Sequence, residues 1–252
     1  MEVHVYTAPG WFSCRTLEAF LSDNGVDFQN HNIAVDEAAR EELKSRGISS
    51  APVTIIDGEA IIGYYPKKLI PALNLDITLE LGSSVEWVAD KYERIMAAAV
   101  RTVAQLSEEN LEVPVSWRPQ TMRQHMLHVL SFPELAYLSH KTGSMSTDDM
   151  RANGERIKGI STIAEIMEYG EKVQKDIANF FSTADSSALD LVVPAHYGGE
   201  VTVLELMNII LRHSTHHLNQ SYWFMEETLG ITVTDKMTEE DLEGIATPTE
   251  LI

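Results

Sequence analysis

Hydrophobic residues recur with a helical period over the longer, C-terminal part of the chain. From Val85 to Leu106 the apolar positions repeat every three or four residues, and three later segments show the same repeat. Capping boxes mark two helix starts, Ser83-Ser-Val-Glu86 and Thr202-Val-Leu-Glu205, and Pro133 is expected to break or kink the second helix. Helices are expected at residues 83–106, 120–133, 163–180 and 202–230, and these predict an all-α up-down four-helix bundle.

The first 78 residues alternate short apolar strands with short helices. Asp57-Gly58 between two apolar runs indicates a hairpin, and Asn24-Gly25 is typical of a helix end. Strands are expected at residues 3–7, 28–33, 53–56 and 60–62, with helices ending near 24, spanning 36–45 and spanning 66–73. This order predicts an α/β layer fold with a small mixed sheet.

These two patterns divide the chain into residues 1–78, 79–234 and 235–252. Between the predicted helices, the polar stretch 142–153 is expected to be a loop, and residues 192–200 a loop or small hairpin. The segment 235–252 is acidic and thinly apolar, so it is expected to be a loosely held C-terminal tail.

Composition narrows the class of protein. A length of 252 residues with 44% hydrophobic residues supports a buried core in each of two domains. A formal net charge of −19 disfavours nucleic acid and anionic membrane surfaces as partners. There is no long apolar run and no signal-peptide pattern, and the single cysteine excludes an internal disulfide. We therefore expect a cytoplasmic protein.

Two histidines lie within the apolar stripe of the last long helix. Val203, Leu206, Ile210, His213, His217, Gln220 and Phe224 follow the alternating three and four spacing of an inward face. His213 and His217 are one turn apart, about 6 Å, so their imidazoles can share one metal ion. A further ligand must come from another helix, where His125 and His128 share roughly one face.

The helical region resembles the DinB/YfiT-like superfamily. The resemblance is clearest at Gly199-Glu-Val-Thr-Val-Leu-Glu-Leu and His213-Ser-Thr-His-His-Leu-Asn-Gln220, and at Trp117-Arg-Pro-Gln-Thr-Met-Arg-Gln-His-Met-Leu-His128. In that family, one histidine of the second helix and an i, i+4 pair of the fourth bind a divalent metal. The resemblance implies His128, His213 and His217 as ligands, with His125 as the alternative to His128. His125, His216 and Gln220 are then candidates to support the ligands or contact a bound molecule.

Residues 1–78 resemble glutaredoxin, which implies a thioredoxin-like fold. The resemblance lies in Tyr6-Thr-Ala-Pro-Gly-Trp-Phe-Ser-Cys14, Ser50-Ala-Pro-Val53, Ile56-Asp-Gly58 and Gly63-Tyr64. It implies a cis-proline at Pro52, after Ala51, and a thiol-binding or redox site formed by Trp11, Cys14, Ala51 and Pro52. Glutaredoxins carry their nucleophilic cysteine where this chain has Trp11, so exchange between two cysteines is impossible. Cys14 is then either a packed small side chain or a single redox thiol.

Three neutral imidazoles suit Zn²⁺, Ni²⁺ or Fe²⁺ and leave a coordination position open, as in catalytic sites. A low-molecular-weight thiol bound there as thiolate would attack an electrophile. The leading hypothesis is a metal-dependent thiol S-transferase or a related detoxifying enzyme, whose partners are a small-molecule thiol and an electrophile. A homodimer is a candidate assembly. The alternatives are a non-catalytic metal-binding stress-response protein and a thiol-redox protein that uses Cys14.

Overall fold

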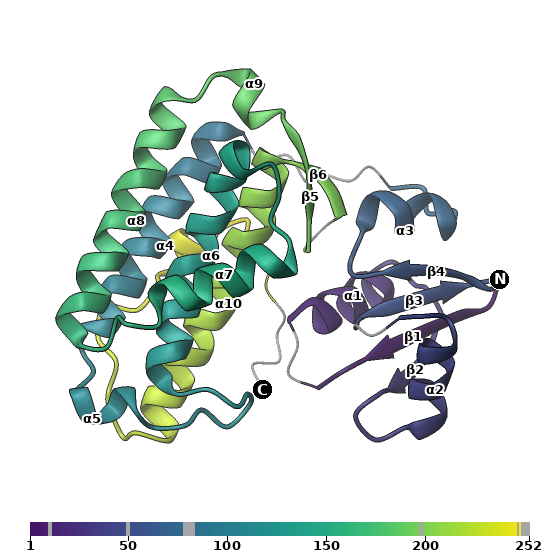
Figure 1. Cartoon of the computed structure of the whole chain (residues 1–252), viewed down its shortest axis with the longest axis horizontal. Helices are drawn as coiled ribbons and strands as arrows, with labels where there is room; N and C mark the ends of the chain where they lie inside the picture. The colour runs from purple at the N-terminus through teal and green to yellow at the C-terminus, as the bar shows by residue number, and fades with distance from the viewer. Residues whose placement is uncertain (10–11, 49–50, 78–83, 197–198, 246, 248–252) are drawn as a thin grey trace. The chain divides into compact units, whose positions relative to one another are not determined.

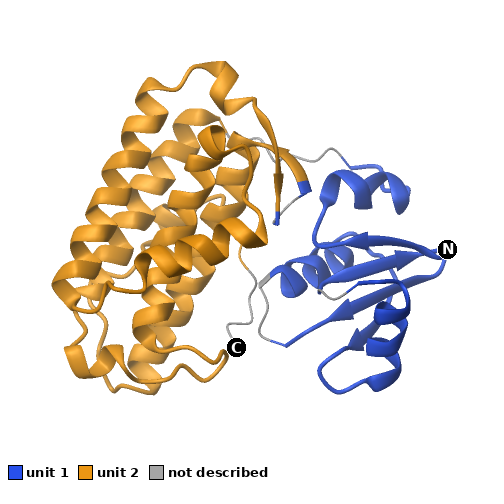
Figure 2. Ribbon diagram, viewed as in Figure 1, with its two compact units in different colours: residues 1–80, 196–199 blue, residues 81–195, 200–252 orange. Residues whose placement is uncertain are grey.

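The computed structural model describes residues 1–9, 12–48, 51–77, 84–196, 199–245 and 247. The chain forms two compact units, one of residues 1–80 with 196–199 and one of residues 81–195 with 200–252 (Figure 2). The predicted domain boundary at residues 78–79 lies outside the described residues. No helix among those described is long and apolar enough to cross a membrane.

The first unit contains a four-stranded mixed sheet in the order β2-β1-β3-β4 (Figure 1). β1 pairs with β2 in parallel, and the β1–β3 and β3–β4 pairs are antiparallel. The elements are β1 Val3–Thr7, α1 Phe12–Asp23, β2 Gln29–Asn32, α2 Glu37–Ser45, β3 Val53–Ile56, β4 Glu59–Ile62 and α3 Pro66–Ala72. The predicted α/β fold with a mixed sheet is confirmed.

Alternation of side chains along β1 creates two apolar faces on this sheet. Val3 and Val5 pack with Leu17 of α1 and Leu69 of α3 on one face. On the other face, Tyr6 belongs to a separate cluster with buried residues of α2. The sheet is therefore a middle layer between α1 and α3 on one side and α2 on the other.

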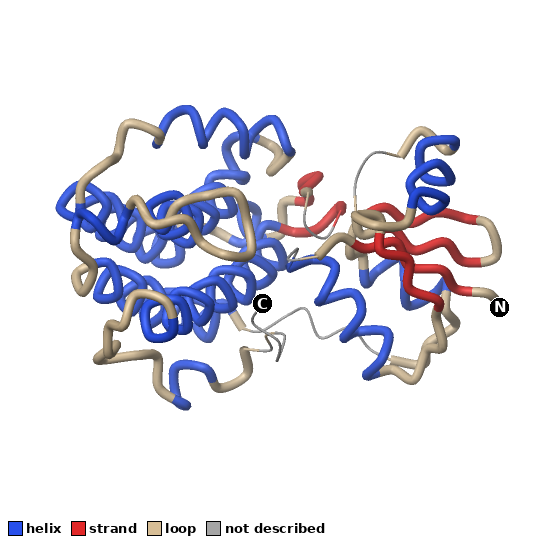
Figure 3. The backbone as a smooth tube through the Cα atoms, turned by 90° about the horizontal axis from the view of Figure 1, so that it is seen from below, coloured by secondary structure: helices blue, strands red, loops and turns tan. Residues whose placement is uncertain are grey.

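The second unit is mostly helical, and its only strands among the described residues form one two-stranded hairpin (Figure 3). Its elements are α4 Val85–Val103, α5 Glu108–Leu111, α6 Met122–Thr142, α7 Thr147–Ile157, α8 Ile163–Thr183, α9 Ser186–Leu189, β5 Val192–Ala195, β6 Gly199–Thr202, α10 Val203–Glu227 and α11 Glu239–Leu242. The four long helices α4, α6, α8 and α10 form the predicted all-α bundle.

Contacts between the long helices establish their directions. α4 and α8 are antiparallel, because the Gln174 side chain donates to the Glu93 carbonyl at 3.1 Å while Gly170 lies against Val100. Gln174 comes after Gly170 on α8, whereas its partner Glu93 comes before Val100 on α4. α8 therefore lies beside α4 and runs in the opposite direction.

The other two pairs follow from two hydrogen bonds. Tyr92, early in α4, donates to the carbonyl of Met207, early in α10, so these helices are parallel. Ser221, late in α10, donates to the sulfur of Met126, early in α6, so α6 and α10 are antiparallel. The succession along the chain is up, down, down, up rather than strict alternation, because residues 143–162 return the chain to the starting end of α6 before α8 begins.

Three local expectations are corrected. The break expected at Pro133 is wrong: α6 continues through it to Thr142, because packing that buries Phe132 and Pro133 outweighs the loss of one backbone donor. The stretch 142–153 contains the start of α7 rather than only a loop, since Ser146 and Asp149 form a capping box. The first long helix has Ser84 as its N-cap; Ser83 lies outside the described residues.

The segment after α10 is held against the bundle up to residue 245. Met237 donates its backbone N–H to the Tyr222 hydroxyl at 3.2 Å, and the buried Lys91 donates to the Glu240 carbonyl at 2.5 Å. Arg94 pairs with Asp241 at 3.3 Å. The expected loosely held tail is therefore wrong for residues 235–245, where these contacts with α4 and α10 offset the low apolar content.

Candidate metal centre

The predicted inward stripe of α10 is buried throughout. Thr202 caps the helix and forms the predicted capping box with Glu205. All seven stripe residues are at most 1% exposed, and the two histidines His213 and His217 have no exposed surface. The helical repeat therefore carries both imidazoles into the bundle interior, as the sequence predicts.

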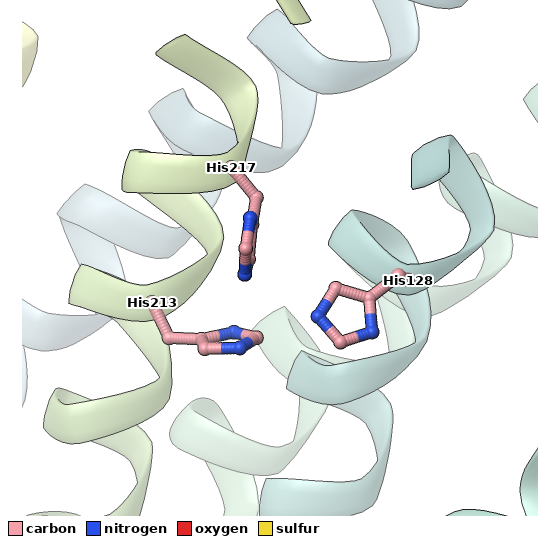
Figure 4. Close-up of side chains that lie close together, drawn as sticks. All are labelled: His128, His213 and His217. Carbon is pink, nitrogen blue, oxygen red and sulfur yellow. The ribbon is translucent and has the colours of Figure 1, made fainter. Parts of the chain in front are cut away.

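His128 meets this pair from α6. Ligand atoms of His128, His213 and His217 lie within 4.8 Å of one another, and within the described parts of the chain no other set of three or more possible ligands is grouped in this way. The ring of His128 lies 4.9 Å from that of His213 and 4.8 Å from that of His217, and the latter two rings are 4.5 Å apart. Figure 4 shows the three rings converging from two helices.

The environment keeps the imidazoles of His128 and His217 neutral. Burial, followed by the neighbouring His213, holds the pKa of His128 and of His217 well below the usual value. The side chain of His128 is partly exposed as a whole, but its Nε2 atom is buried and has no hydrogen-bond partner within the described structure. A buried lone pair of this kind suits a metal ligand, because no proton competes with the ion at neutral pH.

A hydrogen bond sets the tautomer of His217. Its Nδ1 lies 2.6 Å from Oε1 of Gln220, one turn further along α10. Because the amide oxygen can only accept, Nδ1 carries the proton and Nε2 keeps its lone pair. Gln220 therefore orients the ring in the manner expected of a residue behind a metal ligand.

His125 has a different arrangement from His128. Its Nδ1 lies 3.0 Å from the Gln120 amide nitrogen, and its Nε2 lies 2.9 Å from the His217 carbonyl oxygen. Both ring nitrogens are thus engaged, and burial lowers the pKa of His125 to about 4. Of the two candidates on α6, the geometry favours His128 as a ligand and places His125 against the backbone of His217.

Other side chains surround the centre. Phe132 stacks on His213 with ring centroids 4.8 Å apart and also contacts His128 at 3.9 Å, so it forms an apolar wall. His216 is buried, with its ring 5.4 Å from that of His217. Phe132 was missed by the sequence analysis, although its position four residues after His128 on one helix face was a usable signal.

The candidate thiol site of the first unit has different chemistry. Cys14 is 1% exposed, and burial raises the pKa of its thiol to about 11, despite an N–H of Ala8 at 3.4 Å from Sγ. The Ala51–Pro52 peptide bond is cis, as the glutaredoxin resemblance implies. Trp11 lies outside the described residues. Burial and the raised pKa favour a packed, protonated thiol at Cys14 over an activated nucleophile.

Comparison with known proteins agrees with both resemblances. A glutaredoxin family model matches residues 3–61, and a DinB superfamily model matches residues 121–221. An uncharacterized glutaredoxin-like 8.6 kDa protein in the rubredoxin operon of Clostridium pasteurianum is 33% identical over 63 residues, which cover 25% of this chain and 84% of that protein. The chain carries a glutaredoxin domain followed by a DinB superfamily domain.

Two solved structures are similar to different parts of the chain. The crystal structure of a thioredoxin-like protein, a T8A mutant, is 32% identical and covers 30% of this chain and 97% of its own, with a TM-score of 0.29. A DinB-like protein from Bacillus subtilis is 12% identical and covers 60% of this chain and 96% of its own, with a TM-score of 0.46. The three histidines lie on α6 and α10 within the DinB superfamily domain, outside the glutaredoxin domain.

Proposed function

We propose that the DinB domain is a divalent-metal-dependent enzyme that transfers a low-molecular-weight thiol to an electrophile. The observation that supports this most strongly is the convergence of three imidazoles whose ligand atoms lie within 4.8 Å, with no carboxylate or fourth histidine of the described residues in the group. Three protein ligands leave at least one position of Zn²⁺, Ni²⁺ or Fe²⁺ open to an incoming molecule, which distinguishes catalytic from structural sites.

The residues around the centre have separate tasks in this proposal. His128, His213 and His217 would hold the ion through neutral nitrogens, and Gln220 fixes the ring of His217. Phe132 provides an apolar side that limits water and suits a polarisable sulfur ligand. A bound divalent metal would lower the pKa of a coordinated thiol and so supply a thiolate at neutral pH.

The reaction balances without an oxidant. The thiol loses its proton to solvent, its sulfur forms a bond to an electrophilic carbon, and a leaving group such as halide departs with the electron pair. A reducing cytosol, which keeps small thiols in the reduced form, is the compartment that we infer for this activity. The redox alternative is disfavoured, because burial of Cys14 raises rather than lowers its pKa.

The test uses the full chain purified without an affinity tag. Metal content is measured first, and a panel of cellular thiols is then assayed with 1-chloro-2,4-dinitrobenzene as the electrophile. We expect turnover that needs both metal and thiol, that is lost in His217→Ala, and that persists in the matched variant His140→Ala near the end of α6. Stoichiometric metal without turnover for any thiol would instead support a non-catalytic metal-binding protein.

A further inference from the structure

The loop that precedes α6 is held firmly beside the metal centre. The backbone N–H of Val115 donates to the carbonyl of Gln120 at 3.0 Å, and that of Met122 donates to the carbonyl of Val113 at 2.9 Å. A bridge between Pro114 and Thr121 closes the base of the loop. The tip that these bonds present, residues 116–119, is therefore fixed with respect to the first turn of α6.

Trp117 anchors this tip to the histidine cluster. Its ring lies edge-on to His125 at 5.1 Å and to Phe224 at 5.6 Å, and the His125 ring lies 5.5 Å from that of His217. The indole Nε1 is buried and has no hydrogen-bond partner within the described structure. An indole nitrogen can only donate, and a buried donor without an acceptor is costly, so this position suits a ligand that accepts a hydrogen bond.

Arg118, the next residue, adds a positive charge at the same place. Burial is the largest cause that lowers the pKa of His125, His128 and His217, and the Arg118 guanidinium, which lies close enough to act on all three, lowers each pKa further. Three neutral imidazoles would leave the double charge of a bound metal uncompensated. Arg118 and a bound divalent metal would therefore both attract an anion, within a chain whose net charge is −19.

We propose that Trp117 and Arg118 form an anion-recognition rim at the metal centre, and that the molecule which completes the centre carries a carboxylate. This inference rests on the proposed metal-dependent function and specifies its substrate class. The guanidinium binds the carboxylate by charge-assisted hydrogen bonds, and the Trp117 Nε1–H donates to one of its oxygens. The carboxylate belongs either to the thiol or to a second, sulfur-free molecule, and the experiment separates the two.

The experiment uses the full chain loaded with Co²⁺ and two thiol probes, 3-mercaptopropionate and its methyl ester. The sulfur-to-metal charge-transfer band reports binding of each, and the measured quantity is the ratio of the two affinities. Comparing this ratio between variants cancels the difference in acidity between the two thiols. We expect Arg118→Gln to lower the preference for the free acid by about tenfold, the effect of one charged hydrogen bond.

Two further variants complete the design. Arg151→Gln on the exposed surface of α7 removes the same charge elsewhere and should keep the wild-type ratio. Trp117→Phe keeps an aromatic ring but removes the donor, and it should lower affinity for the free acid more than for the ester. An unchanged ratio in Arg118→Gln would overturn the proposal, and if that variant does not fold, an unchanged ratio in Trp117→Phe would do so.

A sulfur-free probe separates this inference from the proposed function. If neither thiol produces a band while Co²⁺ stays bound, the S-transferase proposal fails. Propionate is then titrated against the visible bands of the same protein. A spectral shift in the wild type that weakens in Arg118→Gln would support the anion rim with a carboxylate from a molecule other than the thiol. Absence of any shift in the wild type would overturn the rim as well.

Discussion

Replacing Gln220 by methionine should weaken metal binding without unfolding the bundle. The side chains have similar volume, so the change mainly removes the oxygen that lies 2.6 Å from Nδ1 of His217. Without that acceptor, the proton of His217 is free to move to Nε2, where it blocks the lone pair, and the ring loses its fixed orientation.

The size of the effect follows from this role. Partners that orient a metal-bound imidazole typically contribute 10- to 100-fold in metal affinity, which corresponds to about 1.4 to 2.8 kcal/mol. We therefore expect the dissociation constant for Zn²⁺, measured by competition with a chromophoric chelator, to rise by about that factor in Gln220→Met. Gln220→Glu keeps an acceptor at the same place and should retain near wild-type affinity.

The neighbouring Ser221 provides the control. Ser221→Ala removes a buried hydroxyl that bonds to the His217 carbonyl and to Met126 rather than to the imidazole. It should leave the dissociation constant within about threefold of the wild type. Equal affinity in Gln220→Met and Ser221→Ala, with both proteins folded by circular dichroism, would show that Gln220 does not position the ligand.

Other predictions concern the ligand set, the thiol, the pH response and the packing. His128→Ala should abolish stoichiometric divalent metal binding by elemental analysis, whereas His125→Ala should retain it; the reverse would move the third ligand one turn earlier. The protein should lack disulfide reductase activity in an insulin assay, and robust turnover that Cys14→Ser removes would refute the packed-thiol interpretation. Metal-free protein should lose stability as pH falls below about 6.5. The reason is that His125, His128 and His217, whose pKa values are lowered by folding, stay neutral in the folded protein and bind protons in the unfolded protein. A constant melting temperature between pH 7 and 5 would contradict this. Gly170→Ala should destabilise the protein by about 1–3 kcal/mol in urea unfolding, since a Cβ there would lie 2.8 Å from Val100. Gly154→Ala should stabilise its helix, since a Cβ there would have nothing within 4 Å. Similar changes in unfolding free energy for both variants would refute the packing argument.

The helical repeat of the sequence predicted part of the candidate site. The repeat of apolar residues in α10 already placed His213, His217 and Gln220 on one buried stripe, because helical geometry links sequence spacing directly to a face. The same geometry could not choose between His125 and His128, which share a face. Only the packing of α6 on α10 separated them, by placing His125 against the His217 carbonyl and leaving His128 Nε2 toward the pair.

The sequence alone determined the elements whose signals are local: the strands and helices of the glutaredoxin domain, the four long helices, and the capping box at Thr202. Tertiary structure decided three things that depend on residues far apart in the chain. It allowed α6 to continue through Pro133, it held residues 235–245 against α4 and α10, and it placed α6 and α8 parallel to each other. Burial in the assembled bundle stabilises these features, and no window of neighbouring residues contains that contribution.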